Sequence, residues 1–256
     1  MEIRVREGEV CVRCGDTLDQ PGEFCCVCRL APPPFERAVA YGPYEGRMRE
    51  ALHAFKYDGM RPAARGLGKM LAAAIAQLAG EAPAELLVVP VPLHRSKYAA
   101  RGFNQARALA AEALAALRRS HPEWKLTLAP DTLLRQRATL TQAGLTPRQR
   151  RANLRGAFRV VNEASVRDQH ILLIDDILTT GATARAASSA LLRAGAASVW
   201  VATLARAGRS QRGNEKLLAA WRGQRKQEER YEAGQEEGAR VSETQGMYEA
   251  ADPSSF

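Results

Sequence analysis

Short apolar runs alternate along the chain with longer stretches in which apolar residues recur every three or four positions. The apolar runs predict β-strands, and the periodic stretches predict amphipathic helices. Strands are predicted at 38–41, 86–92, 157–161, 171–174 and 198–204, and helices at 47–55, 61–78, 104–117 and 183–194. Strands interleaved with helices favour a mostly parallel sheet that is covered by helices on both faces. The pattern therefore predicts an α/β fold.

The pattern changes toward both ends of the chain. Residues 1–34 contain all five cysteines and end in three consecutive prolines, which form a stiff linker. We expect a small separate module there and the main domain over residues 35–208. Residues 209–256 lose the periodicity and fill with Gln, Glu, Gly, Ser and Arg. This composition predicts a tail that is partly helical, over 210–229, and then disordered.

Length and composition narrow the class of protein. The 256 residues, of which 46% are hydrophobic, are enough for a sizeable core. No apolar run approaches the roughly 18–20 residues that a membrane-spanning helix requires. The first residues, MEIRVR, show no apolar segment that could act as a secretory signal. The expected location is the cytoplasm.

The chain is basic, with a formal net charge of +9, and this charge is unevenly distributed. The segment from residue 205 onward is neutral, so the first 204 residues carry the whole excess. Two stretches, 86–111 and 132–162, contain no acidic residue. A field of this sign attracts polyanions such as a phosphorylated metabolite or a nucleic acid. A solvated basic face without a ligand is the alternative that charge alone leaves open.

Four of the cysteines have the spacing of a metal site, C-x2-C-x10-C-x2-C. Two tight turns that each present two thiolates supply the four soft ligands of a tetrahedral ion such as zinc. A disulfide pair or unpaired thiols are the alternatives, and the missing secretory signal disfavours the first. No His or carboxylate lies at ligand spacing, which favours a structural site. The predicted ligands are Cys11, Cys14, Cys25 and Cys28, and Cys26 is either a spare thiol or an alternative ligand.

The most specific chemistry lies in residues 171–183, ILLIDDILTTGAT. An apolar strand delivers Asp175 and Asp176 at its carboxyl end, where α/β sheets bind ligands. The small residues 179–183 then open a helix, and the backbone N–H groups there form a cradle for a phosphate. Carboxylates accept hydrogen bonds from vicinal hydroxyls, so the combination indicates a sugar phosphate. The alternative is that the two Asp residues only cap the following helix.

These thirteen residues resemble the phosphoribosyl pyrophosphate (PRPP) motif of type I phosphoribosyltransferases. The resemblance implies that Asp175 and Asp176 hold the ribose hydroxyls and that the loop wraps the 5′-phosphate. The residues of this loop are Thr179, Thr180, Gly181, Ala182 and Thr183.

Together with the N-terminal cysteines, three further blocks resemble the competence protein F (ComF) family. They lie at residues 52–57, 89–105 and 141–158. The resemblance covers about residues 8–205. It implies a type I phosphoribosyltransferase-like parallel sheet flanked by helices, with an N-terminal zinc module. One departure is Lys97, where the family pattern leads us to expect Arg. Lysine keeps the positive charge of arginine but loses its bidentate fork.

The family pattern also implies two loops around the ligand. The first would contact pyrophosphate, and its candidate residues are Leu93, His94, Arg95, Lys97 and Arg101. The second would be a flexible loop over 135–155 that closes over the ligand with Arg148 and Arg151. Its basic, acid-free composition suits both a pyrophosphate lid and a nucleic-acid contact. His94 is the candidate acid or base, and the plain interpretation of Asn104 is the cap of its helix.

By this resemblance the chain is a PRPP-binding protein with a role in DNA uptake during natural transformation. Single-stranded DNA and other competence proteins are the implied partners, and Mg²⁺ would accompany PRPP. The alternative is an active phosphoribosyltransferase of nucleotide metabolism that transfers the phosphoribosyl group to an unknown acceptor. The sequence shows no recognisable acceptor pocket and no obvious general base, so whether the protein is an enzyme is left open.

Overall fold

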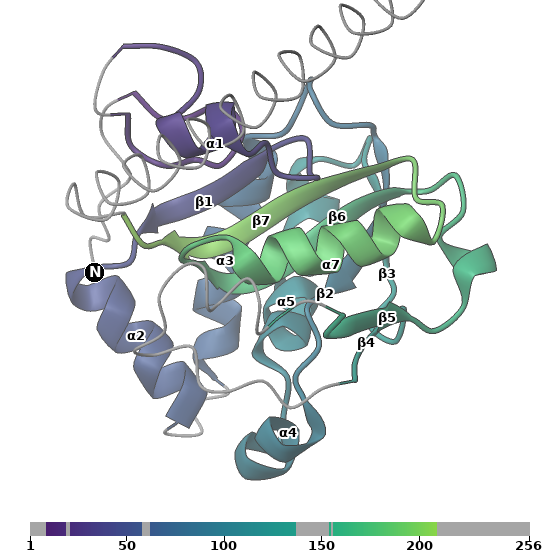
Figure 1. Cartoon of the computed structure of the whole chain (residues 1–256). Helices are drawn as coiled ribbons and strands as arrows, with labels where there is room; N and C mark the ends of the chain where they lie inside the picture. Colours follow the sequence, from purple (N-terminus) through teal and green to yellow (C-terminus); the bar gives the residue numbers. More distant parts are fainter. Residues whose placement is uncertain (1–8, 19–20, 58–61, 137–153, 155, 209–256) are drawn as a thin grey trace, which may run out of the picture. The chain divides into compact units, whose positions relative to one another are not determined.

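A computed structural model describes residues 9–18, 21–57, 62–136, 154 and 156–208 (Figure 1). These residues belong to one compact unit, Met1–Arg209. The predicted tail 209–256, with its helix, and the predicted flexible-loop residues Arg148 and Arg151 lie outside the described residues. The proposed division at residues 34 and 208 stays a prediction.

The helices and strands alternate along most of the chain. In order they are α1 Cys26–Leu30, β1 Ala38–Pro43, α2 Gly46–Tyr57, α3 Ala63–Ala76, β2 Glu85–Pro90, α4 Arg95–Arg101, α5 Gln105–Ser120, β3 Lys125–Leu128, β4 Leu133–Arg135, β5 Phe158–Val160, a 3₁₀ turn Glu163–Ser165, β6 His170–Leu178, α7 Ala182–Arg193 and β7 Ser198–Arg206. None of these helices is both long and apolar enough to cross a membrane.

The main sheet has five strands in the order β1-β7-β6-β2-β3, and all neighbouring strands are parallel. This confirms the predicted α/β fold. From β2 the chain passes through α4 and α5 to β3, toward one edge of the sheet. From β6 it passes through α7 to β7, toward the other edge. The strand order therefore reverses between β2 and β6, and a crevice at their carboxyl ends is the expected ligand site of such a sheet.

Side chains of the central strand β6 point alternately into two apolar layers. Leu172 and Ile174 pack with α2, α3 and α5, whereas Ile171 and Leu173 pack with α7. In Figure 1, α7 crosses the near face of the sheet, and α3 and α5 lie behind it. All four side chains are fully buried, which explains why the strand reads as a continuous apolar run.

The helices α3 and α5 pack closely because of a small residue at their contact. A Cβ built on Gly68 would lie 2.3 Å from Cβ of Glu112. The backbones therefore approach in a way that no larger residue allows. This contact helps to hold α5, whose first residues reach the ligand site.

Several predicted elements differ from the structure. The strand predicted to end at Ile174 continues to Leu178, because β7 pairs with it as far as Arg206. The strand predicted at 157–161 exists as β5, but it forms a separate antiparallel pair with β4. Elements α1, α4, β3 and β4 were not predicted. Each is only three to seven residues long, which is too short to show a hydrophobic period.

Candidate functional site

A pocket of about 210 Å³ lies at the carboxyl ends of β2 and β6, beside the start of α5. It occupies the point where the strand order reverses. Its wall combines two carboxylates, four basic side chains, and polar groups from the start of α5 and the loop before α7. The lining residues are Lys56, Val91, Pro92, Leu93, Lys97, Arg101, Asn104, Gln105, Ala106, Arg135, Asp175, Asp176, Ile177, Thr179 and Thr183.

The two predicted carboxylates have different electrostatic environments. Asp176 forms an ion pair with Lys56, at 2.7 Å between Oδ2 and Nζ. Oδ1 of Asp175 accepts a hydrogen bond from the backbone N–H of Asp176, at 2.9 Å. Burial and the neighbouring charge of Asp176 raise the pKa of Asp175 to about 7, against the opposing effects of that hydrogen bond, Lys56 and Arg135. A carboxyl group of this kind changes charge near neutral pH and has a proton to exchange with a ligand.

Four basic side chains crowd around this carboxylate pair. Burial lowers the pKa of Lys97, and the charges of Arg135, Arg101 and Lys56 lower it further. Burial also lowers the pKa of Arg135, whereas the charge of Asp175 raises it. The Arg135 guanidinium lies 5.5 Å from the ring centre of Phe158. Like charges gathered in a partly buried site repel one another, and an anionic ligand relieves that repulsion. The pocket is therefore suited to an anion.

The loop Thr179–Thr183 supplies a second anion-binding feature. Gly181 adopts the left-handed conformation, with φ of 74°, and caps α7 without any side-chain hydrogen bond. The first N–H groups of a helix have no partner within that helix, so this end is open to an anion. The Oγ1 atom of Thr180 is buried and has no hydrogen-bond partner within the described part of the chain. Thr179 and Thr183 line the pocket, whereas Ala182 is buried.

The start of α5 joins the two sides of the pocket. Asn104 caps this helix by accepting a hydrogen bond from the N–H of Arg107, and its Nδ2 donates to the carbonyl of Val91 at 3.1 Å. The capping interpretation of Asn104 is thus confirmed. Gln105 follows, only 2% exposed, and its Nε2 has no partner among the described residues. A buried amide donor that lines a pocket and lacks a partner is available to a ligand.

The predicted pyrophosphate loop is partly a helix, which corrects its expected form. Arg95, Lys97 and Arg101 all lie in α4, because His94 caps its start and Gly102, with φ of 73°, ends it. The imidazole of His94 accepts a hydrogen bond from the N–H of Ser96. The pocket lining includes Leu93, Lys97 and Arg101 but not His94 or Arg95. Similarly, Arg135, expected as the first residue of a flexible loop, lies in β4.

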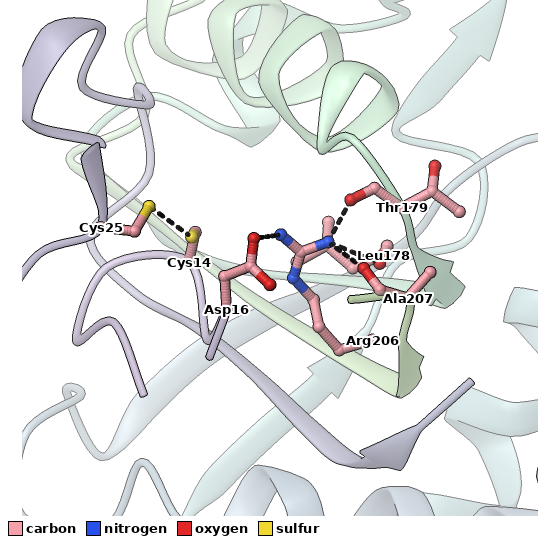
Figure 2. Close-up of polar contacts among 7 residues, drawn as sticks. All are labelled: Cys14, Asp16, Cys25, Leu178, Thr179, Arg206 and Ala207. Atoms are coloured by element: carbon pink, nitrogen blue, oxygen red, sulfur yellow. Dashed lines mark hydrogen bonds and ion pairs between the residues drawn. The ribbon is translucent and has the colours of Figure 1, made fainter. Parts of the chain in front are cut away.

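The four predicted metal ligands lie together. The sulfur atoms of Cys11, Cys14, Cys25 and Cys28 are all within 4.8 Å of one another, and none of the five cysteines forms a disulfide. The Sγ atoms of Cys14 and Cys25 are 3.7 Å apart (Figure 2). Four sulfurs at about 2.3 Å from a tetrahedral zinc ion lie about 3.8 Å from one another. The cluster can therefore hold a metal ion.

The local turn in the cysteine segment supports the same conclusion, and the four thiols share their protons closely. The N–H of Gly15 donates to the carbonyl of Cys11, and Gly15 has a φ of 62°. Hydrogen bonds from the neighbouring thiols, above all Cys14, lower the pKa of Cys11. Hydrogen bonds with Cys11, Cys14 and Cys25 raise the pKa of Cys28. A cation bound by all four sulfurs would replace these shared protons, because each ligand would then be a thiolate. Cys26 begins α1 and is not part of the cluster.

Three residues at or near the site were not predicted to act there. Lys56 and Gln105 line the pocket, and Arg206 contacts the start of the loop Thr179–Thr183. Arg135 also lines the pocket, and it belongs to the flexible loop that was expected to close over the ligand. Lys56 and Gln105 belong to two of the blocks that carried the family resemblance, which was the available signal. The local sequence around Arg206 contains no such signal.

Comparison with known proteins gives a family and several relatives. A model of the phosphoribosyl transferase domain matches residues 102–238. The DNA utilization protein YhgH of Salmonella typhi is 34% identical over 201 residues, which cover 77% of this chain and 84% of that protein. The protein of the same name from Escherichia coli K12 is 32% identical over 199 residues, with the same coverage. Competence protein F of Haemophilus influenzae is 27% identical over 208 residues, or 80% of this chain and 87% of that protein.

Proposed function

Because this chain belongs to the phosphoribosyl transferase domain family, together with competence protein F and the DNA utilization proteins YhgH, we propose that it binds PRPP and serves DNA uptake. The observation that carries the ligand assignment is the carboxylate pair Asp175 and Asp176. It lies in a pocket with four cations, beside the start of α7, whose cap Gly181 makes no side-chain hydrogen bond. A ligand with vicinal hydroxyls and several phosphates matches both halves of this pocket.

Each part of the pocket has a role in this proposal. Asp175 and Asp176 accept hydrogen bonds from the ribose hydroxyls, and Lys56 holds Asp176 in place. The loop Thr179–Thr183 binds the 5′-phosphate through its backbone N–H groups and the Oγ1 atom of Thr180. The pyrophosphate lies toward Lys97, Arg101 and the other cations, with Mg²⁺ bound mainly to its oxygens. His94 and Arg95 keep only a supporting role at the start of α4.

The cysteine cluster is proposed to hold structural zinc through Cys11, Cys14, Cys25 and Cys28. Zinc is preferred because four thiolates at tetrahedral spacing form its usual closed structural site. A segment of this size buries little apolar surface, so the ion would supply much of its stability. Metal analysis of the purified protein and of the Cys11→Ser/Cys14→Ser variant tests this assignment.

A contact with single-stranded DNA is the part of the proposal that rests on relatives. Their names concern DNA utilization and competence, and this chain carries a basic excess in its first 204 residues. The acid-free stretch with Arg148 and Arg151 is the candidate contact. Positive residues that release counterions from a nucleic acid make binding steeply salt-dependent. Other competence proteins are the further candidate partners.

Calorimetry with Mg²⁺-PRPP tests the ligand assignment. The wild type should release or absorb heat on binding, and Asp175→Asn/Asp176→Asn should weaken binding at least tenfold, since two charge-assisted hydrogen bonds to the ribose weaken. The matched control is Asp131→Asn, whose carboxylate is 90% exposed and which is not among the residues that line the pocket. No heat with the wild type, or equal binding by the double variant, would refute the assignment. Pyrophosphate release with added acceptors would indicate a transferase.

Single-stranded DNA binding is measured separately as a function of salt. The Arg148→Ala/Arg151→Ala variant should bind more weakly, and the slope of log affinity against log salt should become shallower by roughly one to two. Arg118→Ala/Arg119→Ala, at the exposed end of α5, removes the same charge elsewhere. Equal slopes for the wild type and the first variant would exclude this stretch from the interface.

A further inference from the structure

The cysteine cluster and the loop Thr179–Thr183 are connected through one buried arginine, Arg206. This residue ends β7 and is only 1% exposed. Its Nη2 lies 3.0 Å from a carboxylate oxygen of Asp16, which is 4% exposed. Figure 2 shows the guanidinium between Asp16 on one side and the carbonyls of the β6 end on the other. A buried charge pair of this kind is costly to break by removal of one partner.

The other side of Arg206 holds the start of the loop. Its Nη1 donates hydrogen bonds to the carbonyls of Leu178, at 2.9 Å, of Thr179, and of Ala207, at 3.1 Å. Leu178 ends β6, and Thr179 is the first residue of the proposed phosphate loop. The guanidinium therefore sets where the loop leaves the strand.

Asp16 is in turn part of the metal-binding turn. It follows Cys14 by two residues, and its backbone carbonyl accepts a hydrogen bond from the N–H of Cys11 at 2.7 Å. The position of this carboxylate thus depends on the turn that presents two of the four thiolates. An ion that fixes this turn also fixes Asp16.

A second contact joins the cysteine segment to the far end of the loop. Arg185, in the first turns of α7, donates to the carbonyls of Ala31 at 2.7 Å and Pro32 at 3.0 Å. These carbonyls follow Cys28 by three and four residues. Both ends of the loop Thr179–Thr183 are therefore attached to the cysteine segment, one through Arg206 and the other through Arg185.

We infer that the four-cysteine segment holds the phosphate loop in its binding conformation, with Asp16, Arg206 and Arg185 as positioning residues. The inference rests on the proposed function, since it takes Thr179–Thr183 as the phosphate loop. No cysteine contacts the ligand in this arrangement. The metal acts through Asp16 and then Arg206 on the carbonyls of Leu178 and Thr179. Its removal should loosen the loop even though the pocket residues are unchanged.

The test compares Asp16→Asn with Arg185→Ala in the full chain. Asp16→Asn keeps the size of the side chain and removes the charge that pairs with Arg206. Arg185→Ala removes bonds on the protein surface, so it should fold even if the buried variant does not. Arg193→Ala, an exposed arginine in the last turn of the same helix, is the matched control. Metal content is measured for every variant to show that the cluster is still occupied.

Two readouts are needed. In ligand-free protein, amide hydrogen exchange across 178–183 should accelerate in both test variants, whereas exchange in β2 and the middle of β6 should not change. Mg²⁺-PRPP affinity should fall roughly tenfold to a hundredfold for Asp16→Asn, since small displacements of a binding loop have effects of this size. Arg185→Ala should show a smaller loss, and Arg193→Ala none. Metal removal from the wild type by a chelator should reproduce the local acceleration.

The possible failures are distinguishable. If the wild type does not bind Mg²⁺-PRPP, the proposed function is wrong, and the exchange data still decide whether the segment holds the loop. Unchanged exchange at 178–183 in both variants would overturn the inference. Acceleration spread evenly over the sheet would also overturn it, because this would show general destabilisation. Unchanged exchange after verified metal loss would overturn the role of the metal.

Discussion

The raised pKa of Asp175 predicts that this residue destabilises the ligand-free protein at neutral pH. The pKa rises from 3.8 to about 7, first because of burial and then because of the charge of Asp176. An acid with a raised pKa in the folded state binds its proton more tightly there than in the unfolded chain. The unfavourable contribution of Asp175 to stability is therefore absent below about pH 4 and grows as the pH rises toward about 7.

The size of this effect follows from the shift. A difference of about three pKa units corresponds to roughly 4 kcal/mol of unfolding free energy once the pH exceeds 7. At pH 5 only about 2 kcal/mol of this loss has occurred. Asp175→Asn has the same size, stays uncharged at every pH, and keeps an oxygen to accept the hydrogen bond from the N–H of Asp176. Its stability relative to the wild type should therefore increase by roughly 2–3 kcal/mol between pH 5 and pH 8.

The assay is urea unfolding of the ligand-free wild type and Asp175→Asn at pH 5, 6, 7 and 8, in buffer without Mg²⁺. The comparison of two proteins at each pH cancels groups that titrate alike in both, including the cysteines. Asp131→Asn is the control, and its stability relative to the wild type should vary little with pH because its carboxylate is 90% exposed. Asp175→Asn should also lose affinity for Mg²⁺-PRPP, so in this variant stability and binding should move in opposite directions.

Two results would refute the reasoning. A stability difference between Asp175→Asn and the wild type that is flat from pH 5 to pH 8 would mean that the pKa of Asp175 is not raised. A difference that grows toward low pH would mean that the folded protein stabilises the ionised carboxylate.

Two further predictions concern the pocket wall. Gln105→Leu removes a buried amide that lacks a partner at Nε2, so the ligand-free protein should keep its stability or gain about 1 kcal/mol. Its affinity for Mg²⁺-PRPP should fall about tenfold. Urea unfolding measures the stability and calorimetry the affinity, and an unchanged affinity would exclude a contact between Gln105 and the ligand. Gly181→Ala should cost about 1 kcal/mol because alanine is strained at a φ of 74°, and it should also weaken Mg²⁺-PRPP binding. The control is Gly46→Ala, at a φ of 45° outside the pocket, which should lose a comparable amount of stability in urea and keep normal affinity. Equal losses of affinity in Gly181→Ala and Gly46→Ala would contradict the role of the loop.

Local chemistry was readable from the sequence wherever a function depends on residues close together in the chain. The pairs of cysteines, the adjacent Asp175 and Asp176, and the small residues 179–183 each lie within a few positions of one another. Their spacing defines the geometry through a single turn, because the backbone restricts where neighbouring side chains can lie. The long helices and buried strands were also predictable, since each presents a clear hydrophobic period.

Short elements were not predictable because their limits depend on caps and on pairing. Helix α4 has no buried residue, and only its His94 cap and Gly102 end define it. Strand β5 is three residues long, and its buried-exposed-buried pattern does not by itself say which strand it pairs with. Its pairing with β4 instead of the main sheet follows from contacts between distant segments.

The α/β class, the four thiolates and the carboxylate pair with its loop all follow from patterns within short stretches of the chain. Tertiary structure alone decided which distant side chains complete the pocket, among them Lys56 from α2, Gln105 from α5 and Arg135 from β4. It also decided that Arg206 lies between Asp16 and the carbonyls of Leu178 and Thr179. Strands that are far apart in the chain become neighbours in the parallel sheet, and their carboxyl ends then meet at one edge. Hydrophobic periodicity predicts where the strands are but not the order in which they pair.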